Sequence, residues 1–318
     1  MSTHAAVELD GQYRVLREGA GFLDRSDRGK LIVRGADGVE FLQGQVTNDV
    51  EAPEPGVGCY AALLDRKGHM QADMRILRLS TGDLWIDTEP ETAGVVERHM
   101  RMYSIGREVE IEDVSAAWAI VSVIGPGAIE ATGSGPLSPE YAQHYYERDG
   151  VEILAVATDL GVDLIARSEQ ASALGQLLAA GSEAVEVSEA AAEIVRVESG
   201  RPRFGREMTT STIPQEAGIA ERAVSFTKGC YIGQETVARL HYKGKPNRHL
   251  RGLRLEALVA DGDAIMLGDR EVGRVGTAVL SPAHGAIALA VIRREAEPGS
   301  RVEVGETGNA AEVGELPF

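Results

Sequence analysis

Residues 228–239 carry the most specific pattern of the chain, K-G-C-Y-I-G-Q-E-T-V-A-R, which begins at Lys228 and ends at Arg239. The pattern places Cys230, one of only two cysteines, between glycines and beside Tyr231. A cysteine acts as a nucleophile or metal ligand only as its thiolate, which nearby cations such as Lys228 favour. The alternative is that Cys230 is a small buried hydrophobic residue, the usual role of a free cysteine.

A second pattern precedes the first. It consists of Arg196-Val197-Glu198-Ser199-Gly200, then Pro202, Gly205 and Glu207, then Pro214-Gln215-Glu216-Ala217-Gly218. Together the two patterns resemble the YgfZ-type folate-binding proteins, relatives of the glycine-cleavage T-protein that are implicated in making or maintaining iron–sulfur enzymes. The T-protein usually reads K-G-D-F-x-G-R-E at the first pattern. Cys230, Tyr231 and Gln234 stand here in the places of that Asp, Phe and Arg.

The resemblance implies an α+β fold in two parts. Residues 1–245 would form a T-protein-like folate-binding region of two interleaved, ferredoxin-like α/β subdomains, and residues 246–318 a small C-terminal β-barrel. The implied cofactor is tetrahydrofolate or one of its one-carbon derivatives. The implied partners are reduced folate and iron–sulfur proteins or their assembly factors.

Length and composition predict a protein with more than one core. A chain of 318 residues exceeds the ~250–300 residues at which single cores stop growing. Residues 1–21 are polar and of mixed charge, which is typical of neither a signal nor a transit peptide. No apolar run approaches the ~18 residues of a membrane span. Two cysteines far apart in sequence favour a cytoplasmic location, with a Cys59–Cys230 disulfide as the weaker alternative.

Charge is spread unevenly along the chain. The net charge of −17 argues against general nucleic-acid binding, which depends on basic residues that neutralise phosphates. The segment from Arg222 to Arg254 nevertheless holds eight lysines and arginines against one acid, Glu235. Such a segment is typical of an anion-docking surface, here for the glutamate tail of a folate. An RNA ligand is a weaker alternative. The segment could also be a solvated basic loop that binds no ligand.

Hydrophobic periodicity predicts alternating strands and helices before residue 246 and strands alone after it. The expected strands before that point are 30–35, 73–79, 84–88, 109–111, 118–124, 151–157 and 162–166. The expected helices are 36–43 with Asp37 as cap, 90–102, 128–131, 168–180 and a helix from Ser188 towards Gly200. The later strands are 250–255, 271–280, 286–292 and 301–304, which suggest a barrel-like module.

Two further segments carry candidate folate contacts through the resemblance. In the T-protein an acidic residue after an L-x-x-x-G segment lies near the reactive folate nitrogen, and Asp73 matches it here after Leu64 to Gly68. An exposed aspartate at the start of a strand is the alternative. Gln43 to Asp49 resembles the family's Q-G-x-x-T-x-D turn. Gln45 and Asn48 would then line the pterin side, unless the turn is purely structural.

The predicted catalytic residues are Cys230 and Asp73. The predicted folate-binding residues are Gln45, Asn48, Asp73, Arg196, Glu198, Lys228, Tyr231, Gln234 and Arg239. Arg196 and Glu198 are two apart on a helix and do not face each other, so at least one needs a partner elsewhere. The T-protein's pterin-contacting glutamate has no clear match, and Asp163 is a poor substitute. The histidines lack metal-ligand spacing, so no metal site is predicted.

Three functional hypotheses follow. The leading one is a tetrahydrofolate-binding protein that supports assembly or repair of iron–sulfur clusters, with Cys230 presenting its sulfur to folate or to a partner's cluster. The second is an enzyme, an aminomethyltransferase or related one-carbon transferase with Asp73 as its acid–base or electrostatic group. Cys230 and Gln234 argue against it. The third is a thiol-based interaction module without folate.

Overall fold

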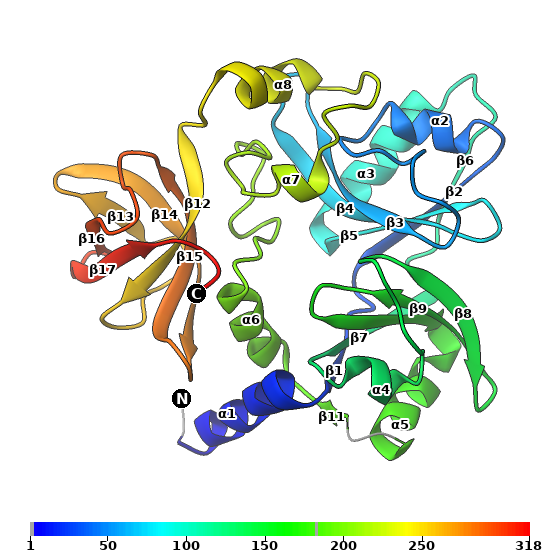
Figure 1. The fold of residues 1–318 in the computed structure, drawn as a ribbon, viewed down its shortest axis with the longest axis horizontal. Coiled ribbons are helices and arrows are strands. Elements are labelled where there is room, and N and C mark those ends of the chain that lie inside the picture. The colour runs from blue at the N-terminus through cyan, green and yellow to red at the C-terminus, as the bar shows by residue number, and fades with distance from the viewer. Residues whose placement is uncertain (1–2, 182–183) are drawn as a thin grey trace. The chain divides into compact units, whose positions relative to one another are not determined.

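The computed structural model describes residues 3–181 and 184–318, and the chain divides into two compact units (Figure 1). The first unit comprises Met1–Leu64, Gln71–Ala191 and Ala223–Ile232. The second comprises Asp65–Met70, Ala192–Arg222 and Gly233–Phe318. The predicted boundary at residues 245 and 246 lies in the loop between α8 (Gln234–Lys243) and β12 (Arg248–Leu255).

The first sheet of the first unit has five strands. Their order is β3 (Gly58–Leu64), β4 (Met70–Arg78), β5 (Leu84–Thr88), β2 (Gly29–Arg34) and β6 (Glu110–Asp113). Two helices, α2 (Gly38–Gln43) and α3 (Pro90–Tyr103), pack against this sheet. Phe41 of α2 and Met100 of α3 enter one core with strand residues such as Ile76. Pro90 occupies the first turn of α3, where its missing N–H leaves no hydrogen bond unmade.

The second sheet of the first unit has six strands. Their order is β11 (Val185–Glu186), β1 (Gly21–Asp24), β7 (Trp118–Ile124), β10 (Gly161–Arg167), β9 (Val151–Ala157) and β8 (Gln143–Arg148). The helices α4 (Ala128–Thr132) and α5 (Ala171–Gly181) share a core with it, and α1 (Thr3–Glu18) precedes β1. A separate core joins the two sheets, where Leu77 and Trp85 of the first meet Ile165 of the second. This packing brings β4 and β10 towards the same space.

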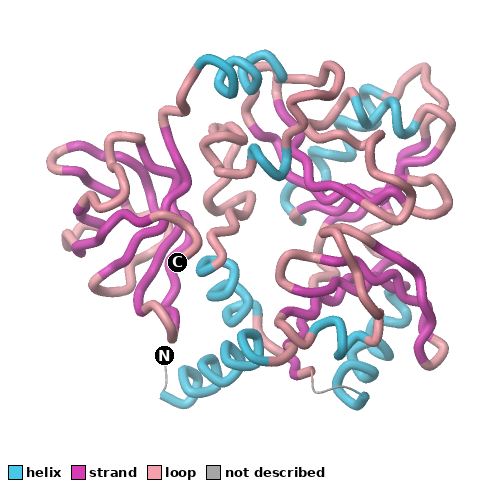
Figure 2. Tube along the Cα trace, in the orientation of Figure 1, coloured by secondary structure: helices cyan, strands magenta, loops and turns pink. Residues whose placement is uncertain are grey.

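The second unit is built around a closed barrel. Its strands follow one another in the order β12, β15 (Gly285–Arg293), β14 (Arg270–Ser281), β13 (Ala264–Leu267), β16 (Arg301–Val304) and β17 (Asn309–Gly314). Closure pairs every strand on both sides, which removes exposed sheet edges. Val197 of α6 (Glu189–Glu198) packs with Leu250 and Leu289 on the outside of the barrel. Figure 2 shows this part as strands and loops after α8.

The predicted α+β fold with a C-terminal barrel is confirmed, with local differences. Ser188 caps α6 as expected, because its Oγ accepts from the Ala191 amide at 3.4 Å. Asp37 precedes α2, but its carboxylate instead accepts from the Glu108 amide at 2.8 Å, so the predicted capping bond was wrong. Sequence patterns also missed the elements α1, α7 (Ala220–Ala223), α8, β1, β3, β8, β11, β13 and β17. No helix in the described ranges is long and apolar enough to cross a membrane.

Candidate functional site

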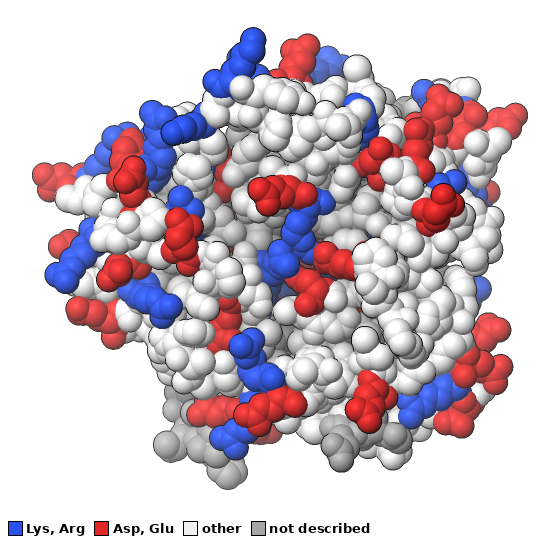
Figure 3. Space-filling model, in the orientation of Figure 1, with Lys and Arg blue, Asp and Glu red and all other residues white. Residues whose placement is uncertain are grey.

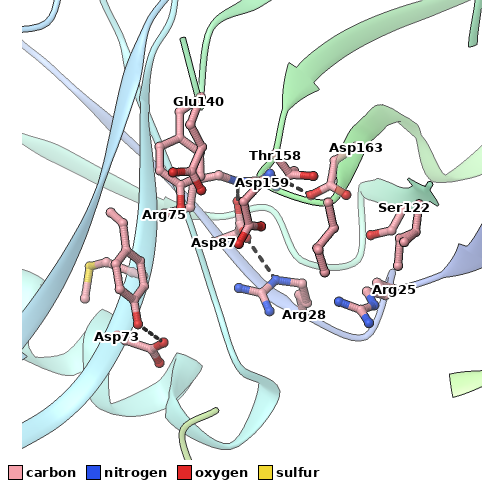
Figure 4. A pocket seen from close by; sticks show the side chains of 15 residues that line it. Arg25, Arg28, Asp73, Arg75, Asp87, Ser122, Glu140, Thr158, Asp159 and Asp163 are labelled. Atoms are coloured by element: carbon pink, nitrogen blue, oxygen red, sulfur yellow. Dashed lines mark hydrogen bonds and ion pairs between the residues drawn. The ribbon is translucent and has the colours of Figure 1, made fainter. Parts of the chain in front are cut away.

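A cavity of about 180 Å³ lies in the first unit, between the two sheets (Figure 4). This volume has room for roughly a dozen water molecules. The lining residues are Arg25, Arg28, Tyr60, Asp73, Met74, Arg75, Asp87, Ser122, Ile124, Glu140, Tyr141, Thr158, Asp159, Leu160 and Asp163. The lining thus combines charged groups of both signs with a few aromatic and aliphatic side chains, a combination typical of sites that orient a polar ring.

Asp73 is held in place from two directions. The Tyr60 hydroxyl donates to Asp73 Oδ2 at 2.7 Å, and the Thr88 hydroxyl donates to the Asp73 carbonyl at 2.6 Å. The other carboxylate oxygen, Oδ1, is buried and has no hydrogen-bond partner among the described residues. Such buried, unsatisfied polar atoms are rare in folded proteins and call for an explanation. Because Asp73 lines the cavity, a water or a bound molecule can make this contact.

Burial raises the pKa of Asp73 from its ordinary value of 3.8 to about 6. The hydrogen bond from Tyr60 opposes the rise, the Glu89 carboxylate adds to it, and the Arg28 guanidinium opposes it. A carboxyl group with this pKa exchanges its proton near neutral pH. It can therefore either donate a hydrogen bond or accept one from a bound molecule.

Arg75 connects the two sheets beside Asp73. Its Nε donates to Asp87 Oδ2 at 2.7 Å, and its Nη1 donates to Asp163 Oδ2 at 2.6 Å. Arg28 adds a bond to Asp87 at 2.9 Å. Burial acts to raise the pKa of Asp87, but Arg75 and Arg28 together hold it below its ordinary value. The remaining nitrogen, Arg75 Nη2, is buried and has no acceptor in the described ranges.

The local sequence explains why these groups meet. Side chains alternate along a strand, so Asp73 and Arg75 share one face of β4 while Met74 and Ile76 enter the core. The loop between β1 and β2 brings Arg28 to the same place. Lys30 is fully buried, and its ammonium donates to the backbone carbonyls of Ser26 and Arg28 at 2.7 Å each. Lys30 thereby fixes the course of that loop.

The loop that carries Cys230 is anchored by its neighbour Lys228. The Lys228 ammonium donates to the carbonyls of Gln43, Val46 and Asn48 at 2.6, 2.8 and 2.7 Å. Burial lowers the pKa of Lys228 to about 8, which still leaves the group charged at neutral pH. All three ammonium protons have acceptors. Lys228 therefore holds residues 225–231 against the turn at residues 43–49.

The two cysteines have opposite environments. Cys230 is exposed, so the alternative that made it a buried hydrophobic residue was wrong. It does not belong to the lining of the Asp73 cavity. Cys59 is buried, and burial raises the pKa of its thiol to about 12, which keeps it protonated. Both cysteines are free, so the considered disulfide between them is absent.

The predicted turn residues reach Asp73 only through Tyr60. The Asn48 amide donates to the Tyr60 carbonyl at 2.8 Å, and the Tyr60 hydroxyl contacts Asp73. Gln45 lies 3.0 Å from His99 Nε2 on α3. Of the folate-binding candidates in the described chain, Asp73 alone lines the cavity. Gln45 and Asn48 make contacts within the protein and do not belong to the lining of the cavity.

Arg196 and Glu198 have buried partners of their own in the second unit. Arg196 contacts Glu193 at 2.8 Å, Glu207 at 3.0 Å and Thr277 at 2.8 Å. Glu198 accepts from the Ser281 hydroxyl at 2.6 Å. Both residues therefore have partners elsewhere, where the sequence predicted this for at least one of them.

The other candidates lie apart from the cavity as well. Tyr231 is buried beneath the Lys228 ammonium, which lies 5.2 Å from the ring centroid. Gln234 and Arg239 belong to α8 in the second unit, where Arg239 is exposed. Sequence reasoning missed Tyr60, Arg28 and Arg75. The two-residue spacing from Asp73 to Arg75 was a signal that could have identified Arg75.

Comparisons with known proteins identify the family of the chain. Residues 4–228 match the model of the GCVT N-terminal domain, and residues 248–318 match the glycine cleavage T-protein C-terminal barrel domain. The chain belongs to the glycine cleavage T-protein family. An aminomethyltransferase of Rubrobacter xylanophilus is 28% identical to it, covering 98% of this chain and 86% of the relative. One from Symbiobacterium thermophilum is 30% identical, covering 96% and 88%.

A solved structure has the same fold as this T-protein family member. It is the glycine cleavage system aminomethyltransferase T of Bartonella henselae, with a TM-score of 0.86 and 21% identity. The match covers 98% of this chain and 89% of that chain. The likeness therefore extends through both units. The more specific YgfZ-type assignment depends on the motif around Cys230.

Proposed function

We propose that this T-protein family member binds tetrahydrofolate or a one-carbon derivative in the cavity around Asp73. Through Cys230 it would support assembly or repair of iron–sulfur clusters in client enzymes. The observation that carries the folate part is the pair of buried atoms without partners, Asp73 Oδ1 and Arg75 Nη2, at one cavity wall. One is an acceptor when ionised and the other a donor, as the edge of a reduced pterin requires.

The residues of the cavity fit such a ligand by their chemistry. Tyr60 fixes Asp73 so that Oδ1 can hold or release a proton near neutral pH. Arg75 keeps a donor for a ring carbonyl, while Asp87 and Asp163 hold its guanidinium in position. The apolar side chains of Met74, Ile124, Tyr141 and Leu160 give the cavity hydrophobic walls. A reduced folate would supply ring nitrogens that carry a one-carbon unit.

The role proposed for Cys230 depends on its exposure rather than on the cavity. An exposed thiol on a loop fixed by Lys228 can meet a second molecule directly. A stable cluster normally takes four cysteine ligands, so the other ligands would come from the client or an assembly factor. A reducing cytoplasm would keep this thiol free.

A second candidate function is aminomethyl transfer. It is favoured by Asp73, which retains the acidic position, and by relatives that are named aminomethyltransferases. Against it, Cys230 and Gln234 replace residues that are usual in that enzyme. Ammonia release from an aminomethylated lipoyl carrier protein, with tetrahydrofolate present, separates the two candidates.

Two experiments test the leading proposal. Calorimetric titration with tetrahydrofolate should give binding that weakens at least tenfold in Asp73→Asn, because the substitution removes the ionisable oxygen. If the wild-type protein does not bind tetrahydrofolate, the folate proposal is wrong and the hypothesis of a thiol-based interaction module without folate remains. In cells that depend on this protein, Cys230→Ser should lower iron–sulfur enzyme activities while the protein accumulates normally. Unchanged activities would remove the cluster role.

A further inference from the structure

The second unit contains a cavity of its own, with a volume of about 470 Å³. Its walls come from the segment at residues 206–212 and from strands β12, β14 and β15 of the barrel. Four arginines line it, namely Arg206, Arg248, Arg274 and Arg293. Acidic and basic side chains are mixed over the visible face of the barrel (Figure 3). The cavity is therefore not part of a uniformly basic surface. It differs from its surroundings in that some of its arginines lack an ion-pair partner.

Two of the arginines have no counter-ion. Arg248 and Arg293 are direct cross-strand partners in the register of β12 and β15. Directly opposed side chains lie on the same face with Cβ atoms about 5 Å apart, and like charges there repel. No carboxylate of the described ranges lies within ion-pair distance of either. Arg248 acts on the nearby Glu216 only at longer range, where it opposes the rise that burial causes in the pKa of Glu216.

The other charged groups of the lining are committed. Arg206 pairs with Asp261 at 2.9 Å, and Arg274 pairs with Glu271 at 3.1 Å. Glu207 accepts from Arg196 at 3.0 Å and from the Arg203 amide at 2.9 Å. Repulsion from the two acids of the lining is thus largely neutralised. The charges of the lining without an ion-pair partner among the described residues are those of Arg248 and Arg293, and Arg293 acts on Glu295 only at longer range. The second carboxylate oxygen of Glu207, Oε1, is buried and has no hydrogen-bond partner in the described ranges.

Small and hydroxylic residues complete the walls. Gly262, Gly273 and Gly276 belong to the lining, and a Cβ on Gly273 would meet Ile292 at 2.8 Å, so this glycine also lets two strands lie close together. A Cβ on Gly276 would come within 2.8 Å of Glu207, so this glycine lets the wall pack closely. Thr209 and Ser211 add exposed hydroxyl groups that can donate to an anion.

We propose that this cavity binds a small polyanion, an organic molecule with two or more phosphate or carboxylate charges held by Arg248 and Arg293. A guanidinium group offers a planar fork of donors that matches both oxyanions. An anion between the two groups would also replace their repulsion with attraction. Arg248 belongs to the basic segment found in the sequence, whereas Arg293 joins it only through the barrel register. The site is independent of the folate proposal.

Two chemical sources supply such charges, a phosphate ester and an oligoglutamate tail. Calorimetric titration of the full-length protein with inorganic pyrophosphate and with γ-linked triglutamate distinguishes them. Arg248→Gln and Arg293→Gln should each weaken binding of the preferred probe at least tenfold. Arg301→Gln is the matched control, since Arg301 is exposed on strand β16 of the same barrel and does not line the cavity. It should change binding less than twofold.

The results decide the proposal in either direction. Tighter binding of pyrophosphate assigns the site to phosphate esters, and tighter binding of triglutamate assigns it to oligoglutamate tails. The proposal is overturned if the wild-type protein binds neither probe, a result that requires no variant to fold. It is equally overturned if both variants fold, by circular dichroism, and bind as the wild type does.

Discussion

Replacing Asp73 by Asn should make the first unit more stable at neutral pH. Asparagine keeps an oxygen that can accept from the Tyr60 hydroxyl, and it removes the charge whose burial raises the pKa to about 6. The native aspartate is therefore a residue that folding alone would not favour. A gain in stability from removing it is the behaviour expected of a group that serves a ligand.

The size of the effect follows from linkage. A raised pKa means that the folded state binds the proton more tightly than the unfolded state does. Well below the ordinary pKa of 3.8, both states are protonated and Asp73 costs nothing. As pH rises towards 6 the wild-type protein loses stability, and above that the loss is constant. The change from 3.8 to about 6 corresponds to about 3 kcal/mol at most, because residual solvent contact screens the charge.

Urea unfolding measures this difference. Trp85 and Trp118, the only two tryptophans, both belong to the first unit with ring centroids 5.6 Å apart, so fluorescence reports on that unit. Asp73→Asn should gain up to about 3 kcal/mol at pH 7.5 and only about 1 kcal/mol at pH 4.5. A gain that does not change with pH, or a loss at pH 7.5, would refute the electrostatic reasoning.

Tyr60→Phe is the matched control for the direction of the shift. The Tyr60 hydroxyl stabilises the charged carboxylate, so its removal should move the pKa of Asp73 further up. The pH at which the stability loss caused by Asp73 levels off should therefore be higher in Tyr60→Phe than in the wild-type protein. If the Tyr60→Phe profile coincides with that of wild type, the hydrogen bond does not set the pKa.

Four further substitutions test the structural contacts by urea unfolding. Arg196→Met should cost about 3–5 kcal/mol because it leaves buried Glu207 without its cation, and an unchanged midpoint would contradict this. Lys228→Met should cost about 2–4 kcal/mol, since three carbonyls lose a charged donor; a neutral result would separate the Cys230 loop from this anchor. Gly276→Ala should cost about 1–3 kcal/mol through the clash with Glu207, whereas Gly94→Ala in helix α3, which meets nothing within 4 Å, should gain about 0.5–1 kcal/mol.

The sequence predicted those elements whose side-chain pattern reflects burial. Strand β4 alternates Ala72, Met74 and Ile76 into the core, and the barrel strands are bounded by glycine and proline. Helix α8 was missed because it buries Val237 alone and so shows no apolar stripe. It also begins after Gly233 in a left-handed conformation, which hides the usual capping signal. Local pattern therefore loses an element with little buried surface such as α8, and it also lost the buried strand β3, whose Ala61 and Leu63 enter the core.

The candidate site was predictable only in part, for a topological reason. Asp73 was found through the family motif. Its partners come from strands that lie far apart in the chain, as in the pair of Arg75 with Asp163. Which strands adjoin depends on sheet order, and periodicity does not determine sheet order. The same holds for Lys228, whose acceptors lie about 180 residues earlier.

The buried polar side chains around the candidate site and the motifs are of two kinds, those with all their hydrogen bonds made and those with one atom lacking a partner. Lys228 and Arg196 donate hydrogen bonds to acceptors within the protein, which indicates that they fix loops and helices in position. Asp73 and Arg75 each retain a buried atom without a partner, which lowers stability unless something binds there. Lys228 consequently governs where Cys230 lies rather than acting from the cavity. The ligand binding proposed at Asp73 and the chemistry proposed at Cys230 should therefore be separable, so a substitution at either residue should leave the other role intact.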